Sequence, residues 1–223
     1  MDFVTLRQRL ATLETSHFAD ADKNIRIMDA GLRPLRLGQK LVGRAFTLIC
    51  REDFMTVLVA LDQAQPGDVL IVDTRGSRRA VLGELFGLEA QRRGLAGIVV
   101  DGPVRDTATL RTLDIPVYAR SATPVAGSIA TLFPVQQPVQ CGGVTVNPGD
   151  IVFGDEDGVI VAAPEELAAL LPIATDIEAR ERSVMVRLAA GENLLSMLNF
   201  EEHYANLIAG RESALRFEGP VRQ

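Results

Sequence analysis

The middle of the chain alternates short apolar runs with segments whose apolar residues recur at helical spacing. The runs DVLIVD (68–73), LAGIVVDG (95–102) and IPVYAR (115–120) read as strands. The segment AVLGELFGLEAQRRG (80–94), between the first two, reads as a helix. Strands that alternate with helices in this way pair at least partly in parallel. The pattern therefore predicts βαβ units and an α/β fold.

The second half of the chain changes character. VQCGGVTVNPGDIVFGDEDGVIVAAP (139–164) separates short apolar runs by Gly, Pro and Asp turns, which predicts a β-rich layer. PEELAALL (164–171) then opens a helix, because it has an early Pro and two acidic residues where the helix dipole favours them. No linker, low-complexity tract or long repeat is found. We expect one domain over 1–223, with a C-terminal helical region over about 164–210.

Composition argues against several classes of protein. The net charge of −6, with no Trp and only two Tyr, works against binding to a phosphate backbone, so we expect no nucleic-acid ligand. No apolar stretch is long enough to span a bilayer, and the charged first residues lack the apolar core of a signal peptide. Cys50 and Cys141 lie far apart and read as reduced core residues. We therefore expect a cytoplasmic protein that does not bind membranes.

The stretch DGPVRD (101–106) places an Arg beside an Asp directly after an apolar strand. Twenty residues separate Arg105 from Glu84, which lies in the segment expected to be helical. One helix, a turn and one strand fit in this interval, so the start of the helix and the end of the strand can face one crevice. Ligands of open α/β sheets favour such a crevice, beyond the carboxyl ends of the strands.

These residue types suit an anionic ligand and a metal ion. A helix that begins near Gly83 leaves the N–H groups of Glu84, Leu85 and Phe86 free to seat a carboxylate or phosphate. Arg105 adds a planar fork for a carboxylate or a developing enolate oxygen. The carboxylate that follows it, Asp106, is a ligand for Mg²⁺, which often takes one or two protein carboxylates and keeps its waters. Glu84 could hold one of those waters or act as a base.

Each of these residues also has a simpler interpretation. Asp106 precedes TATL and could cap a short helix, with Arg105 as its surface partner and Glu84 as an ordinary first-turn acid. Arg78 and Arg79 could clamp a distal carboxylate of a substrate, or they could form a solvated basic loop. Spacing alone does not decide between these alternatives.

The longer stretch PGDVLIVDTRGSRRAVLGELFGLEAQRRGLAGIVVDGPVRDTATLRTLDIPVYARSATPVAGS (66–128) resembles the core of a known family. NPGDIVFGDEDGVIVAAP (147–164) and RLAAGE (187–192) are similar to its C-terminal half. The family contains 4-hydroxy-4-methyl-2-oxoglutarate aldolase, 4-carboxy-4-hydroxy-2-oxoadipate aldolase and the regulator of ribonuclease activity A. It also contains proteins once labelled demethylmenaquinone methyltransferases. The acidic residue followed after twenty residues by Arg-Asp is the most specific shared element.

This resemblance implies a swivelling β/β/α-type fold, assembled as a homotrimer or homohexamer with the active site at a subunit interface. It implies that Asp106 holds Mg²⁺ or Mn²⁺ mostly through water, and that Arg105 binds the pyruvyl oxygen and stabilises the enolate. The Gly83–Phe86 backbone would seat the pyruvyl carboxylate. Glu84 stands where many relatives have Asp, and its longer side chain could shift the base or the substrate preference.

The aldolases of the family also use a Glu from a neighbouring subunit, for which Glu178, Glu181 and Glu192 are candidates. The tail after RLAAGE departs from the aldolase pattern. We expect a divalent-metal-dependent lyase that cleaves 4-hydroxy-2-oxo acids to pyruvate and decarboxylates oxaloacetate. The alternative is a non-catalytic regulator that binds a ribonuclease. The regulator lacks an Asp after the Arg, and this chain keeps Asp106, which favours the enzyme.

Overall fold

The structure is a computed structural model that describes residues 3–217. It divides into two compact units, with the division between Ile173 and Ala174. The single domain expected from the sequence includes residues 1–2 and 218–223, which lie outside the described residues.

The first unit is built on one large sheet. Its helices are α1 (Phe3–Leu10), α2 (Thr15–Ala21), α3 (Met55–Gln63), α4 (Glu84–Arg92), α5 (Thr107–Leu110) and the beginning of α6 (Pro164–Ala189). Its strands are β1 (Arg26–Ile27), β2 (Arg33–Pro34), β3 (Leu41–Ile49), β4 (Asp68–Asp73), β5 (Gly97–Val104), β6 (Val117–Ala122), β7 (Val139–Cys141), β8 (Val144–Val146), β9 (Ile151–Gly154) and β10 (Val159–Ala162).

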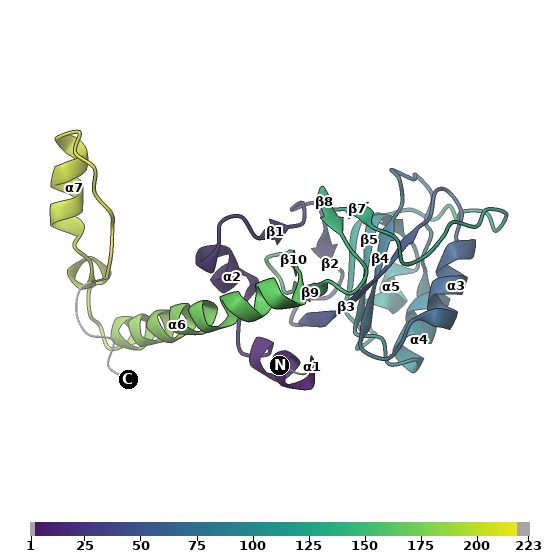
Figure 1. Ribbon diagram of the computed structural model, residues 1–223, viewed down its shortest axis with the longest axis horizontal. Coiled ribbons are helices and arrows are strands. Elements are labelled where there is room, and N and C mark those ends of the chain that lie inside the picture. Colours follow the sequence, from purple (N-terminus) through teal and green to yellow (C-terminus); the bar gives the residue numbers. More distant parts are fainter. Residues whose placement is uncertain (1–2, 218–223) are drawn as a thin grey trace. The chain divides into compact units, whose positions relative to one another are not determined.

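Eight of these strands form the sheet in the order β1-β10-β9-β3-β4-β5-β6-β2 (Figure 1). The central strands β3, β4, β5 and β6 run parallel, and the flanking strands pair antiparallel. This mixed sheet, with helices at the C-terminal end of the chain, confirms the predicted α/β class. The second half of the chain contributes β9 and β10 to this same sheet, and only β7 and β8 form a separate hairpin.

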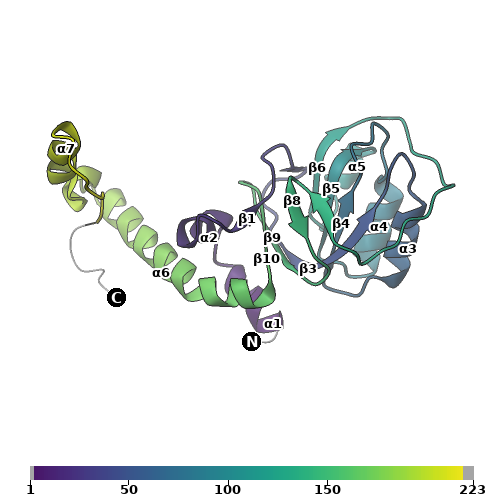
Figure 2. The ribbon, with the colours of Figure 1, turned by 45° about the horizontal axis from the view of Figure 1, so that its top comes forward.

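Both faces of the central strands are covered. The helices α3, α4 and α5 cover one face, and the β7–β8 hairpin lies over the other (Figure 2). Leu70 and Val72 of β4 belong to the core on the helical face, and Val69 and Ile71 to the core under the hairpin. All four side chains are buried. Successive side chains of a strand point to opposite faces, so a strand covered on both sides must be apolar throughout. This is why DVLIVD reads as a continuous apolar run.

The helix expected over 80–94 begins later than its apolar spacing suggests. Residues 80–83 are not helical, and α4 starts at Glu84. Ala80 instead forms a parallel bridge with Ala126, a partner that lies far along the chain. The prediction of a helix is therefore wrong for residues 80–83. Pairing with a distant segment overrides the local helical periodicity there.

The second unit contains the rest of α6, the 3₁₀ helix η1 (Leu194–Met197) and α7 (Phe200–Ile208). The side chain of Asn199 is buried and joins the segment after α7 to its start: it donates to the carbonyl of Ala214 and accepts from the N–H of Arg216. Leu198 and Phe217 pair across the same junction. The tail thus folds back on the beginning of α7.

The two cysteines are buried and free, which confirms the expectation from their spacing. Burial raises the pKa of the Cys50 thiol to about 12 and raises that of Cys141 as well. Of the helices that the structure describes, none is both long enough and apolar enough to cross a bilayer.

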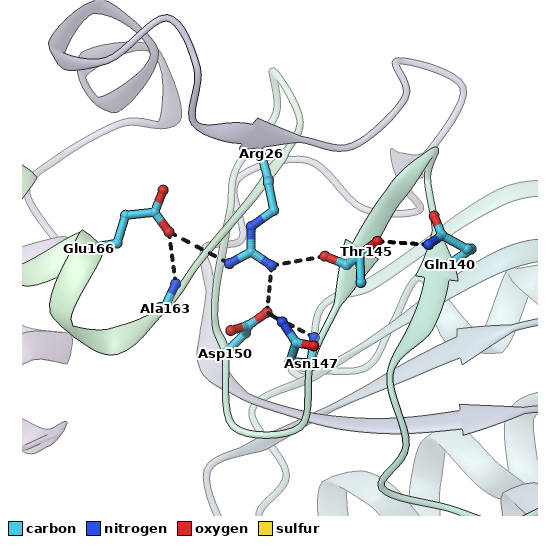
Figure 3. Close-up of polar contacts among 7 residues, drawn as sticks. All are labelled: Arg26, Gln140, Thr145, Asn147, Asp150, Ala163 and Glu166. Atoms are coloured by element: carbon cyan, nitrogen blue, oxygen red, sulfur yellow. Dashed lines mark hydrogen bonds and ion pairs between the residues drawn. The ribbon is translucent and has the colours of Figure 1, made fainter.

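Arg26 ties the edge of the sheet to the turn before β9 and to the start of α6 (Figure 3). Its Nη1 donates to the Asp150 carboxylate at 2.6 Å and to the Thr145 carbonyl at 2.8 Å, and its Nη2 lies 3.6 Å from the Glu166 carboxylate. The Asp150 side chain is only 6% exposed and also accepts from the Asn147 N–H. A carboxylate this buried needs its cation, because an unpaired buried charge is costly.

Replacing Arg26 by Met should lower the free energy of unfolding by about 1–3 kcal/mol, because Asp150 then keeps only part of its hydrogen bonding. Denaturant unfolding followed by circular dichroism measures this loss. The control is Lys23→Met, which breaks the exposed pair with Asp20 and should cost less than about 1 kcal/mol. Equal losses in the two variants would contradict the role given to Asp150 burial.

Candidate functional site

The carboxyl ends of β4, β5 and β6 meet at one edge of the sheet, where ligands of such sheets bind. Arg105 and Asp106 follow β5 directly, after a register irregularity between Val100 and Pro103 in its pairing with β6. After β4 the chain crosses to the start of α4 at Glu84. The topology therefore brings together the two segments that the sequence separates by twenty residues.

The extended residues before α4 are held on both sides. Ala80 donates to the carbonyl of Val125 at 2.8 Å and accepts from the N–H of Gly127 at 3.0 Å. The next anchor is the carbonyl of Leu82, which accepts from the N–H of Arg105 at 3.0 Å. These three backbone bonds fix Gly83, the residue that precedes the helix, against the end of β5.

Gly83 leaves the space that Asp106 occupies. A Cβ at residue 83 would lie 2.5 Å from Asp106 Oδ2 and about 3 Å from the Arg105 side chain, at 3.0 Å from Cγ and 3.1 Å from Nε. The backbone of Gly83 is extended, with φ −147°, so the need for glycine is one of space and not of conformation. Beside it, the N–H of Glu84 donates to Asp106 Oδ2 at 3.3 Å.

Asp106 has a left-handed backbone, with φ 54° and ψ 38°, and its side chain makes no capping hydrogen bond to α5. Its Oδ2 lies 3.3 Å from Nε of Arg105. The capping interpretation of Asp106 is therefore wrong for its side chain, which turns back toward α4. Left-handed backbone at a residue other than glycine is uncommon and is often found at functional sites.

Hydrogen-bond donors that suit an anion gather at this corner. The Arg105 side chain is 42% exposed and has N–H donors beyond Nε, which faces Asp106. The N–H groups of Leu85 and Phe86 are in the first turn of α4 and have no acceptor within the helix. A guanidinium and the amides at a helix start together suit a carboxylate.

The Glu84 side chain points elsewhere. Its Oε2 accepts a hydrogen bond from Thr109 Oγ1 of α5 at 2.7 Å, and Glu84 is not among the described residues that line the cavity. Its N–H group thus belongs to the site, while its carboxylate is bound to the neighbouring helix.

A cavity of about 180 Å³ adjoins the corner. This is smaller than pockets for drug-sized ligands, which measure roughly 300–1,000 Å³. Its lining is mostly apolar, and Phe54 and Phe86 meet there edge to face with ring centroids 5.5 Å apart. The lining residues are Phe54, Ala80, Val81, Leu82, Gly83, Leu85, Phe86, Arg105, Asp106 and Ala126.

Asp53 supports the wall of this cavity and was not foreseen from the sequence. Its buried carboxylate accepts from the N–H groups of Met55, Ala130 and Thr131 and from Ser128 Oγ. Burial alone would raise the pKa of Asp53, but these hydrogen bonds outweigh it and the pKa is lowered. The stabilisation is therefore complete near neutral pH and is lost in acid. The sequence signal for Asp53 is an Asp shortly before the start of α3, and such a residue suggests only a helix cap.

A divalent cation fits the residues present, with one protein carboxylate. Within residues 3–217 no cluster of three or more His, Cys, Asp or Glu side chains could enclose a metal ion. Asp106 is partly exposed, with 35% of its side chain accessible, and its contacts with Arg105 and with the Glu84 N–H are both made by Oδ2. Mg²⁺ accepts such a site, because it often binds one or two carboxylates and retains several waters.

The other residues considered from the sequence are not among the described residues that line the cavity. Arg79 Nε pairs with Glu52 Oε2 at 3.2 Å, and the N–H of Arg78 donates to Glu52 Oε1. In the second unit, Glu178 pairs with Arg182 at 3.0 Å and Glu192 with Arg187 at 2.7 Å. Glu181 belongs to the same unit.

Replacing Gly83 by Ala should lower the free energy of unfolding by about 1–3 kcal/mol, because its methyl group would displace Asp106 or Arg105. Thermal unfolding measures the loss, and a crystal structure of the variant shows the displacement. Gly158→Ala is the matched control, because a Cβ there meets nothing within 4 Å and should change stability by less than about 0.5 kcal/mol. An undisturbed Asp106 carboxylate in Gly83→Ala would refute the packing described here.

Comparison with known proteins shows which family the chain resembles. The model of the RraA-like family, described as Aldolase/RraA, matches residues 15–161. A protein of Halalkalibacterium halodurans named "Putative 4-hydroxy-4-methyl-2-oxoglutarate aldolase" is 34% identical over 190 residues, which cover 82% of this chain and 89% of that protein.

Solved structures show the same likeness. RraAS2 of Streptomyces coelicolor, described as an unusual member of the RNase ES inhibitor RraA protein family, is 35% identical with a TM-score of 0.72, over 81% of this chain and 96% of that one. The RNA-processing inhibitor RraA from Thermus thermophilis is 33% identical with a TM-score of 0.63, over 67% and 92% of the two chains. The chain therefore belongs to the RraA-like family, which joins aldolases and RraA proteins.

Proposed function

We propose that this protein is a divalent-metal-dependent lyase that cleaves 4-hydroxy-2-oxo acids to pyruvate and also decarboxylates oxaloacetate. The observation that carries the proposal is the convergence of Arg105, Asp106 and the first amides of α4 at one cavity mouth. A 2-oxo acid has a carboxylate and a ketone oxygen on the neighbouring carbon, and both groups need hydrogen-bond donors. The name of the Halalkalibacterium halodurans relative supports the same chemistry.

In this proposal the N–H groups of Leu85 and Phe86 seat the substrate carboxylate, and Arg105 binds the 2-oxo oxygen. Cleavage breaks the bond between C3 and C4, and its electron pair becomes the enolate of pyruvate. The 4-hydroxyl loses its proton and C4 becomes the carbonyl carbon of the second product, while C3 of the enolate takes a proton. Arg105 faces the oxygen on which negative charge develops, so it stabilises the transition state more than the substrate.

Decarboxylation of oxaloacetate uses the same binding and yields the same enolate. The bond between C3 and the C4 carboxylate breaks, CO₂ leaves, and C3 takes a proton. No hydroxyl proton has to be removed, so this reaction needs Arg105 and the amide seat but no base. In the aldol cleavage Glu84 is the proposed acceptor of the hydroxyl proton, through an ordered water because its carboxylate is held by Thr109 and does not line the cavity.

Asp106 would hold Mg²⁺ or Mn²⁺, mainly through the water shell of the ion. A bound divalent ion supplies positive charge against the developing enolate oxygen, as a Lewis acid. The proposed assembly is a trimer or hexamer. The exposed apolar side chains of Met185, Val186, Leu207 and Ile208 in the second unit support it, because such exposure is typical of surfaces that another chain covers.

A second candidate is a non-catalytic regulator that binds a ribonuclease. The likeness to the two RraA structures favours it. Asp106, poised with Arg105 beside a cavity, favours the enzyme, because binding to a protein partner requires neither the cavity nor the left-handed backbone. Pyruvate release from oxo acids distinguishes the enzyme from the regulator.

Purified protein with Mg²⁺ should release pyruvate from oxaloacetate and from 4-hydroxy-4-methyl-2-oxoglutarate, and EDTA should abolish both reactions above background. Asp106→Ala should lower kcat/KM by about 100- to 1,000-fold, because the ion loses its protein ligand. Asp114→Ala removes a carboxylate that is 91% exposed and should change nothing. Rates equal to background in EDTA, in Mg²⁺ and in Asp106→Ala would exclude the lyase and leave the regulator.

Glu84→Gln should separate the two reactions. Gln keeps the backbone amide and can still accept the hydrogen bond from Thr109, but it cannot take a proton. We expect kcat for aldol cleavage to fall by about 100-fold or more, while oxaloacetate decarboxylation changes less than about threefold. Steady-state kinetics with both substrates measure the split. An equal loss in both reactions would show that Glu84 acts on the shared enolate and not on the hydroxyl proton.

A further inference from the structure

The 125–131 segment lies between the start of α3 and the residues that precede α4. Its Ser128 forms a bridge with Asp53 on one side, and its Ala126 forms a bridge with Ala80 on the other. Both bridges are parallel, so the segment acts as a short extra strand between two parts of the chain. Each of these parts contributes to the cavity lining, so the segment holds one wall of the cavity against the other.

The carboxylate of Asp53 anchors this segment. Its Oδ2 accepts from Ser128 Oγ at 2.7 Å and from the N–H groups of Ala130 and Thr131 at 2.6 Å and 3.0 Å. Its Oδ1 accepts from the N–H of Met55, at the start of α3, at 2.9 Å. Asp53 is only 2% exposed. Hydrogen bonds to an ionised oxygen are strong, and loss of this acceptor would leave the N–H groups of the loop unpaired.

Backbone hydrogen bonds connect this anchor to the start of α4. Gly127 donates to the Ala80 carbonyl at 3.0 Å, and Ala80 donates back to the segment at 2.8 Å. Two residues further on, the Leu82 carbonyl accepts from the N–H of Arg105 at 3.0 Å. A displacement of the segment would therefore shift the start of α4 relative to Arg105.

We propose that Asp53 is a positioning residue for the anion seat, which consists of Arg105 and the N–H groups of Leu85 and Phe86. Asp53 is not among the described residues that line the cavity, so it acts through the 125–131 segment and not by contact with a ligand. The inference rests on the proposed function, which places the carboxylate of an oxo acid at this seat. It adds a residue that neither holds the substrate nor takes part in the chemistry.

Asp53→Ser separates the anchor from the contact with α3. A serine hydroxyl can still accept from the Met55 N–H, but it is one bond shorter than the carboxylate and leaves Ala130 and Thr131 without their acceptor. Amide hydrogen exchange at Ala80 should become faster by about tenfold or more. Oxalate is a planar dianion that resembles the enolate of pyruvate. Calorimetry at fixed Mg²⁺ should show that the variant binds oxalate about tenfold more weakly, or worse, because the seat is misplaced.

Asp155→Ser is the matched control. Asp155 is 7% exposed, and its carboxylate accepts from the N–H of Asp157, two residues on, and from the N–H and Oγ1 of the distant Thr15 at 2.7 Å and 2.8 Å. It is not among the described residues that line the cavity. This variant should lose stability in thermal unfolding but keep the oxalate affinity of the unmodified protein. Equal weakening of oxalate binding in the two Ser variants would overturn the inference, since the effect would then follow from a general loss of stability.

Gly127→Ala displaces the same segment and leaves the Asp53 side chain in place. A Cβ at residue 127 would lie 2.8 Å from the Glu52 carbonyl oxygen and 3.0 Å from the backbone nitrogen of Asp53. This variant should also bind oxalate about tenfold more weakly. Gly43→Ala, near the amino end of β3, brings a Cβ within 2.5 Å of the Val69 side chain and should leave oxalate binding unchanged. If Asp53→Ser does not fold, these two variants decide, and unchanged affinity in Gly127→Ala overturns the inference.

The exchange measurement separates this inference from the proposed function. If the unmodified protein does not bind oxalate with Mg²⁺, the proposed function loses its support. Slow exchange at Ala80 in Asp53→Ser would then overturn the positioning role independently. If the unmodified protein binds oxalate, unchanged oxalate affinity in Asp53→Ser would overturn the positioning role and leave the proposed function intact.

Discussion

A side chain at residue 83 and the carboxylate of Asp106 cannot occupy the same space, and the geometry of the site follows from this exclusion. With glycine there, Asp106 Oδ2 comes within 3.3 Å of both the Glu84 amide and Arg105 Nε. The start of α4 and the end of β5 thereby share one mouth. The backbone bond from Arg105 to Leu82 holds the contact from the other side. Close approach of these two segments, more than any single charge, makes this corner suitable for an anion.

The fold places that corner with little freedom. Because β4 and β5 are parallel and adjacent, the crossover between them must leave the end of one and return to the start of the other. The segment before α4 is then trapped between Arg105 and the 125–127 backbone, and the Asp53 carboxylate anchors the loop that follows residue 127. A left-handed Asp106 persists in this setting, since its surroundings fix it on several sides.

Sequence reasoning succeeds where the determinants are local. The interval between Glu84 and Arg105 fits one crossover of regular dimensions, so spacing alone brings the start of a helix to the end of a strand. The cavity wall could not be foreseen, because Phe54 and Ala126 come from distant segments without a motif. The direction of the Glu84 carboxylate depends on Thr109, a contact that spacing does not encode. The extended conformation of residues 80–83 could not be predicted for the same reason, since Ala80 pairs with Ala126, which is distant in the sequence.

In the proposed lyase, the apolar lining of the cavity would strengthen the action of Arg105. Apolar side chains around the mouth lower the local dielectric, so Arg105 acts more strongly on a developing enolate oxygen than it would in water. Stabilisation of the transition state by Arg105 would thus depend on Phe54, Phe86 and Leu85, which line the cavity without carrying charge.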